Sequence, residues 1–190
     1  ITQMLWVNLI MDTFAAMALA SLPPSQRVML DAPRPRTAFI ISRPMRWTIV
    51  GMGLFFTALL LALLIVFERY DVTSLTCLFH LNTCCTAQPG LTPYELSLFF
   101  TLFVMLQFWN LFNSRAFGTG RSAFHFKDCG GFVGIATLVV VGQVLIVTFG
   151  GRMFSVTPLS LTDWCIAISG TSLVLWVFEA FHFIHRLLHR

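Results

Sequence analysis

The sequence predicts an all-α protein, a polytopic helical membrane bundle with about five transmembrane helices. Hydrophobic residues make up 57% of the chain, charged residues only 11%, and the mean hydropathy is +0.81. Soluble domains carry about 25% charged residues, so this deficit indicates a chain that lies in lipid. Its apolar runs are about 20 residues long, which is the length that crosses a bilayer as a helix. The polar connections are too short for a soluble domain, so residues 1–190 are expected to form one membrane unit.

Five apolar runs are the expected spans. Each is bounded by proline, glycine or charged residues, as is typical where a helix leaves the bilayer. In chain order they are Gln3 to Ala20, Trp47 to Phe67, Pro93 to Phe112, Phe132 to Phe149 and Asp163 to Ile184. Residues 21–46, between the first two runs, are expected to form a cytoplasmic loop.

The first span carries two polar residues, Asn8 and Asp12, in the stretch WVNLIMDTFAAMALA. A carboxylate within a span costs about 2.5 to 3.5 kcal/mol on insertion scales, so it marks an ion path or a polar interior. The two positions are four apart and share one helix face. Their oxygens suit a hard cation such as Ca²⁺, which needs six to eight ligands, so other spans must complete the site. The alternative is a hydrogen-bonded pair that only joins helices.

The distribution of basic residues predicts the orientation, because cytoplasmic loops are enriched in Lys and Arg. Most of them follow the first, third and fifth spans. The N-terminus of the chain is therefore expected outside and the C-terminus in the cytoplasm of an integral protein of the cell membrane. Because Ile1 leads straight into a span with no signal-peptide features, we expect the back portion of a longer protein. The basic residues form no aromatic-interleaved stripe, so no nucleic-acid partner is expected.

Two further groups of polar residues lie in a connection or near the ends of the spans, and no transport role is expected for them. Cys77, Cys84 and Cys85 lie in a connection assigned to the outside, where a disulfide could form; a metal site with His80 is the alternative, although the spacing fits no standard zinc pattern. Glu95 and Asp163 lie near span ends, where solvation at the membrane interface is their expected role.

Three stretches resemble one protein family. QMLWVNLIMDTFAAMALA followed by SLPP resembles the sixth transmembrane span of P-type calcium-transporting ATPases, especially those of the plasma-membrane type. TLFVMLQFWNLFNSRAFG is similar to the eighth span, and FSVTPLSLTDW to the approach to the tenth. The resemblance implies that the chain covers spans six to ten of a ten-span pump, and that the missing partner is the N-terminal half, with spans one to five and the cytoplasmic domains.

The resemblance also implies the roles of individual residues. Asn8 and Asp12 match the ion-ligating Asn and Asp of the sixth span, which act with backbone carbonyls and a glutamate of the fourth span. The phosphorylated aspartate of the family lies in a DKTGT motif that the sequence lacks, so no catalytic residue is expected here. ATP and Mg²⁺ would act only in the full-length pump, and this fragment alone should be inactive. The end of the chain at Arg190 leaves no room for a long calmodulin-binding tail, which favours a bacterial-type pump.

Two positions differ from the two-ion calcium pumps of the reticulum type. Met11 and Gln107 stand where a threonine and a glutamate contribute to the second site of those pumps. A thioether is a soft, weak ligand for a hard cation, and an amide lacks charge. We therefore expect one Ca²⁺ site, with Gln107 as a structural polar residue near the pathway.

Two alternatives to a calcium pump remain open from the sequence. One is a stand-alone membrane channel or structural membrane protein in which Asn8 and Asp12 only pack helices. The other is a P-type pump for a different cation.

Overall fold

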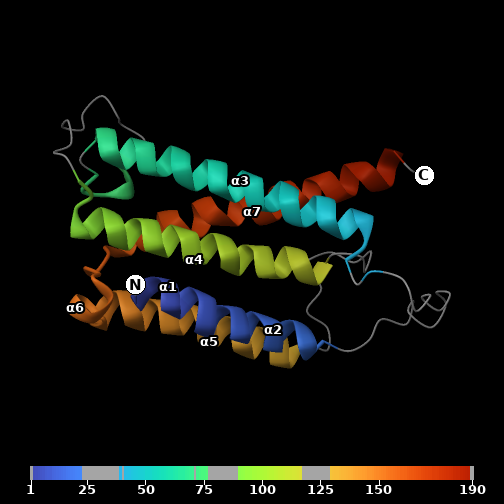
Figure 1. The fold of residues 1–190 in the computed structure, drawn as a ribbon, viewed down its shortest axis with the longest axis horizontal. Coiled ribbons are helices and arrows are strands. Elements are labelled where there is room, and N and C mark those ends of the chain that lie inside the picture. Colours follow the sequence, from blue (N-terminus) through green and yellow to red (C-terminus); the bar gives the residue numbers. More distant parts are fainter. Residues whose placement is uncertain are drawn as a thin grey trace.

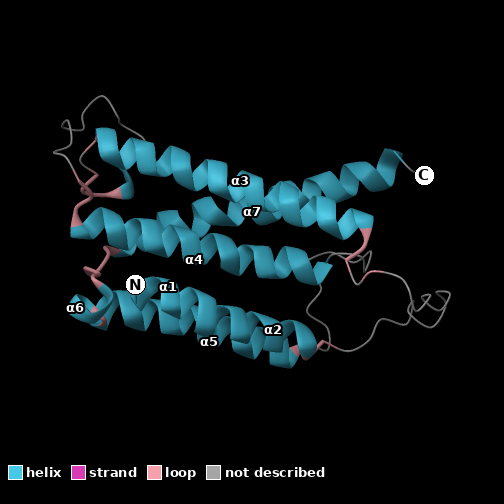
Figure 2. Cartoon of the chain, in the orientation of Figure 1, coloured by secondary structure: helices cyan, strands magenta, loops and turns pink. Residues whose placement is uncertain are grey.

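The computed structural model describes residues 2–22, 39, 41–70, 72–76, 90–116 and 129–188. Figures 1 and 2 show helices joined by loops. The elements are α1 (Thr2–Leu5), η1 (Trp6–Met11), α2 (Asp12–Ala20), α3 (Arg43–Arg69), α4 (Pro93–Ala116), α5 (Gly130–Phe149), α6 (Gly151–Phe154) and α7 (Leu161–Leu188). Most of the expected loop 21–46 lies outside the described residues, as do Cys77, His80, Cys84 and Cys85.

The all-helical prediction is confirmed. Five helices in the described part of the chain are long and apolar enough to cross a membrane: Thr2–Ala20, Met45–Arg69, Pro93–Ala116, Gly130–Phe149 and Leu161–Ala180. The first of them combines α1, η1 and α2 into one continuous rod, in which the middle segment η1 is π-helical.

Helix α4 is the centre of the bundle. It contacts α7 and α3 on one side and α5 on the other, while α5 also packs along α2 (Figure 1). More than half of the α4 span is buried. The other helices therefore surround α4, and α4 exposes the smallest share of its span to lipid.

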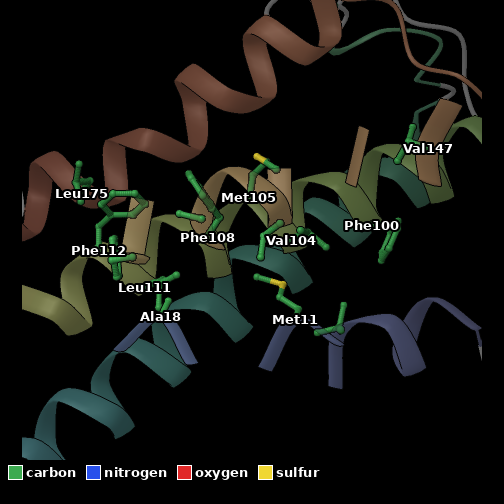
Figure 3. Close-up of a cluster of buried hydrophobic side chains, with 14 of the residues drawn as sticks. Met11, Ala18, Phe100, Val104, Met105, Phe108, Leu111, Phe112, Val147 and Leu175 are labelled. Atoms are coloured by element: carbon green, nitrogen blue, oxygen red, sulfur yellow. The ribbon is translucent and has the colours of Figure 1, made fainter. Parts of the chain in front are cut away.

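The main core lies where the first helix, α4 and α5 meet. Met11 and Ala18 of the first helix pack with Val104 and Phe108 of α4, and Figure 3 shows Met11 pointing toward α4. The Phe112 ring meets the Phe132 ring of α5 edge to face, with centroids 5.1 Å apart, an arrangement that aromatic pairs prefer. Dense apolar packing fixes the position of the first helix against the bundle.

Helix α5 runs antiparallel to the first helix at close range. The Gln3 amide donates to the carbonyl of Phe154, the last residue of α6, at 2.7 Å. Trp6 lies against Gly142, where an added Cβ would come within 3.0 Å of the indole ring. Gly142 therefore allows this close approach, as small residues do between membrane helices.

Helix α3 is the least covered of the membrane helices. Only 6% of its span is buried, and large apolar side chains such as Trp47, Leu54 and Leu61 are exposed along it. Ser42 caps its start, since the Ser42 hydroxyl accepts the N–H of Met45 at 3.4 Å. An apolar surface of this kind fits contact with lipid.

Two buried carboxylates fasten the segment 72–76, which follows α3, to the starts of α4 and α7. We call Glu95, Asp163 and this segment the carboxylate latch. Glu95 accepts the N–H of Val72 at 2.9 Å, and Asp163 accepts the N–H of Leu75 at 2.7 Å. The hydroxyls of Ser74 and Ser160 donate to Asp163 at 2.9 and 2.7 Å, and the Tyr94 hydroxyl also donates to it.

The latch corrects the interpretation of both carboxylates. Solvation at the interface was the expected role of Glu95 and Asp163, but they are only 1% and 0% exposed. Buried carboxylates require hydrogen-bond donors, and backbone N–H groups and hydroxyls supply them here. Both residues are therefore structural.

Candidate cation site

Asn8 and Asp12 lie where the first membrane helix departs from α geometry. Asn8 is part of η1, and Asp12 is the first residue of α2. Their neighbours Val7 and Met11 are buried in the core, whereas Asn8 and Asp12 are exposed. The two polar side chains therefore lie on the face that is turned away from the described bundle.

The π-helical segment changes the backbone hydrogen bonds between these two residues. The N–H of Asp12 donates to the carbonyl of Val7, five residues earlier, whereas an α-helix would use the carbonyl four residues earlier. Asn8 and Asp12 remain about one turn apart, as a π-helical turn is only slightly wider. Such segments inside α-helices occur frequently at functional sites.

The chemistry of the pair is a carboxylate beside a carboxamide. In the described ranges, no hydrogen bond or ion pair engages either side chain, so the hydrogen-bonded alternative has no partner there. The same ranges also bring together no three His, Cys, Asp or Glu side chains that could hold a metal. A hard cation bound here would need further oxygen ligands, and these must come from elsewhere in the protein.

Met11 and Gln107 take different places. Met11 is 5% exposed and belongs to the core cluster, so its thioether points away from the face that carries Asn8 and Asp12. Gln107 is half-buried on α4. Its predicted hydrogen-bonding role stays a prediction, because its side chain makes no hydrogen bond within the described segments.

Three other buried polar side chains have unpartnered atoms. Thr101 of α4 and Gln143 of α5 are fully buried, and neither the Thr101 hydroxyl nor the Gln143 amide has a hydrogen-bond partner among the described residues. The buried Asn113 amide likewise has no hydrogen-bond partner among the described residues. Asn113 lines a cavity of about 270 Å³ with Asn110 and Ser114. Neither Thr101 nor Gln143 was expected from the sequence, although a glutamine inside the apolar run VVVGQVLIV is a signal for a buried polar side chain.

Comparison with known proteins agrees with these features. The family described as "Cation transporting ATPase, C-terminus" matches residues 1–184. Plasma membrane calcium-transporting ATPase 3 of Homo sapiens is 36% identical over 181 residues, which cover 90% of this chain and 14% of that protein. Plasma membrane calcium-transporting ATPase 4 of Bos taurus is 34% identical over 179 residues, covering 92% and 14%.

The chain thus spans about one seventh of the length of these relatives. The family match covers nearly the whole chain. The five long apolar helices agree with a membrane region of such a protein. The chain therefore belongs to the cation-transporting P-type ATPases, of which it is the C-terminal membrane region.

Proposed function

We propose that this chain is the ion-pathway part of an ATP-driven Ca²⁺ pump, in which Asn8 and Asp12 are ligands of the transported ion. ATP hydrolysis, Mg²⁺ binding and the remaining ligands belong to the rest of the pump. The observation that carries the proposal is the pair of oxygen-bearing side chains on one face of an apolar span, turned away from the core.

Two arguments support Ca²⁺ as the ion. Carboxylate and amide oxygens are ligands that Ca²⁺ prefers, and the relatives at 34 to 36% identity carry names of calcium transporters. One occupied site fits the residues better than two, because Met11 is buried in the core and Gln107 carries no charge. By likeness to these relatives, we place the pump in the plasma membrane; they are animal proteins and lend no support to a bacterial origin.

The first prediction concerns Asp12→Asn in the full-length pump. A neutral amide pairs more weakly with a divalent ion in a low-dielectric site, so we expect the Ca²⁺-dependent phosphoenzyme formed from ATP to fall at least about tenfold at a fixed Ca²⁺ concentration. The matched control is Thr57→Val. Thr57 is an exposed polar residue of α3 whose hydroxyl, among the described residues, bonds only the Gly53 carbonyl, at 2.8 Å. Its loss should leave the signal unchanged.

Unchanged Ca²⁺ dependence in Asp12→Asn would reject Asp12 as a ligand. The full-length pump without substitutions is used to count the Ca²⁺ sites. Bound radioactive Ca²⁺ counted against phosphoenzyme should approach one ion per phosphoenzyme, and a ratio near two would contradict the single site.

A further inference from the structure

Two cavities lie where the first half of α3 meets α4 and α7. The larger has a volume of about 430 Å³ and lies between α3 and α7. The smaller, of about 270 Å³, is the cavity that Asn113 lines, and it extends to Leu19 of the first helix. Thr48, Met52 and Phe178 line both of them. The two cavities are therefore neighbours, and we call them together the α3 pocket.

The larger cavity of the α3 pocket is largely apolar. Besides the three shared residues, its lining consists of Trp47, Gly51, Phe55, Val174 and Val177. Among the described residues that line either cavity, none is charged, so a charged headgroup would have no counter-charge there. Sites for small molecules typically have volumes of about 300 to 1,000 Å³ and apolar walls with a few polar groups. The pocket therefore suits a neutral and mainly apolar molecule.

The smaller cavity supplies the polar groups. Asn110, Asn113 and Ser114 line it from the end of α4. Asn113 is only 3% exposed, and neither the oxygen nor the nitrogen of its amide has a hydrogen-bond partner among the described residues. Leaving a buried amide unpaired costs free energy. A hydroxyl group can donate and accept hydrogen bonds, so a ligand hydroxyl at this end would pair with the amide.

The polar groups lie at the edge of the membrane span, and the apolar walls reach deeper. Asn113 is in the last turn of α4, which ends at Ala116, on the side of the bundle where α3 begins (Figure 1). Phe55 lies about 18 Å along α3 from its start at Arg43, at about 1.5 Å per residue. A molecule that fills both cavities therefore holds its polar group at the membrane interface and its apolar body in the hydrocarbon. A sterol has this shape, with one neutral hydroxyl at one end of a rigid apolar ring system.

We propose that the α3 pocket binds one sterol molecule, with its hydroxyl paired to the Asn113 amide and its rings against the aromatic side chains of α3 and α7. The sterol fills the space between these two helices and so attaches α3, the least covered helix, to the bundle. A phospholipid fits less well, because its phosphate would meet no counter-charge among the described lining residues. The proposal is independent of the cation site, since neither Asn8 nor Asp12 lines the pocket.

Photolabelling of the full-length pump tests the site. The pump in phosphatidylcholine vesicles is irradiated with a cholesterol analogue that carries a diazirine in its ring system, and mass spectrometry identifies the labelled peptides. We expect label on the peptides that contain residues 47–55 and 174–178. An excess of cholesterol should lower this label at least about fivefold. Epicholesterol, whose hydroxyl has the opposite orientation, should lower it less than about twofold.

Two glycines of α3 provide a matched pair of variants. A Cβ added at Gly51 or at Gly53 would meet no other atom within 4 Å, so both positions have space for a side chain. Gly51 lines the α3 pocket, whereas Gly53 does not. We expect Gly51→Leu to fill the pocket and lower the label at least about fivefold, and Gly53→Leu to change it less than about twofold. Both variants should still form the phosphoenzyme, which shows that they are folded.

A third variant, Asn113→Leu, tests the polar end of the pocket. It removes the amide at nearly constant side-chain volume, and we expect it to lower the label about tenfold, as for a lost hydrogen bond to a buried group. Unchanged label in this variant would overturn the pairing with the sterol hydroxyl. Equal labelling of Gly51→Leu and Gly53→Leu, or competition by epicholesterol as strong as by cholesterol, would show a cleft for any apolar molecule and would overturn the sterol site.

Discussion

At the scale of single residues, the fully buried Gln143 costs stability. Neither atom of its amide has a hydrogen-bond partner among the described residues, and a buried unpaired amide costs about 1 to 3 kcal/mol. Methionine has a similar length and no such groups. We therefore predict that Gln143→Met raises the free energy of unfolding by about 1 kcal/mol, which a higher thermal unfolding midpoint of the full-length protein in detergent would report.

The matched substitution is Gln3→Met, which should lower the thermal unfolding midpoint instead of raising it. The Gln3 amide donates to the Phe154 carbonyl at 2.7 Å, so methionine there removes a hydrogen bond worth about 1 kcal/mol. A lower midpoint for Gln143→Met would mean that its amide has a partner in the complete protein.

At the scale of elements, the carboxylate latch holds three helix ends together. Asp163→Ala removes the acceptor of several hydrogen bonds and strands the buried N–H of Leu75. Since hydrogen bonds to charged groups contribute about 1.5 to 3 kcal/mol each, we predict a loss of about 3 kcal/mol in the free energy of unfolding. Unfolding in mixed detergent micelles measures it.

The control for the latch is Glu68→Ala. Glu68 is an exposed carboxylate near the same end of α3, and its removal should change stability by about 0.5 kcal/mol or less. Equal losses in the two variants would show that the latch adds nothing beyond a surface charge.

At the scale of the whole molecule, the helices alternate in direction across the membrane. The start of α3 should face the cytoplasm and the start of α4 the outside, because basic residues gather beside the former. In a background without reactive cysteines, Ile41→Cys should react with a membrane-impermeant reagent only from the cytoplasmic side, and Leu91→Cys only from outside. Both positions are exposed. The reverse labelling would invert the proposed topology.

Much of the fold follows from local sequence patterns. The apolar runs predict five long helices because a helix must be long and apolar enough to cross the bilayer, and these properties are written in consecutive residues. The spacing of Asn8 and Asp12 likewise predicts their shared face. The described residues show no further ligands beside this pair, so the rest of the proposed site cannot be argued from local sequence patterns.

Nonlocal contacts explain what the sequence did not reveal. From the sequence, Glu95 looks like a solvated residue at the end of a span. In the structure it accepts the N–H of Val72, which is distant in sequence. The π-helical segment is hidden because the sequence of Trp6–Met11 is apolar enough for an ordinary α-helix. Thr101 and Gln143 become notable only when their burial is seen.

The carboxylate latch has a mechanical consequence. Because it fastens one end of α3, α4 and α7, it would serve as a common pivot if these helices tilt during transport. Helix α4 has 24 residues, so its arm is about 36 Å long at about 1.5 Å per residue. A tilt of about 3° at the pivot moves the far end by about 2 Å, which is the size of helix shift that switches subunit interfaces. For tilts about the latch, helix displacements would therefore be smallest at the latch and largest at the opposite end, where α3 begins and α4 ends.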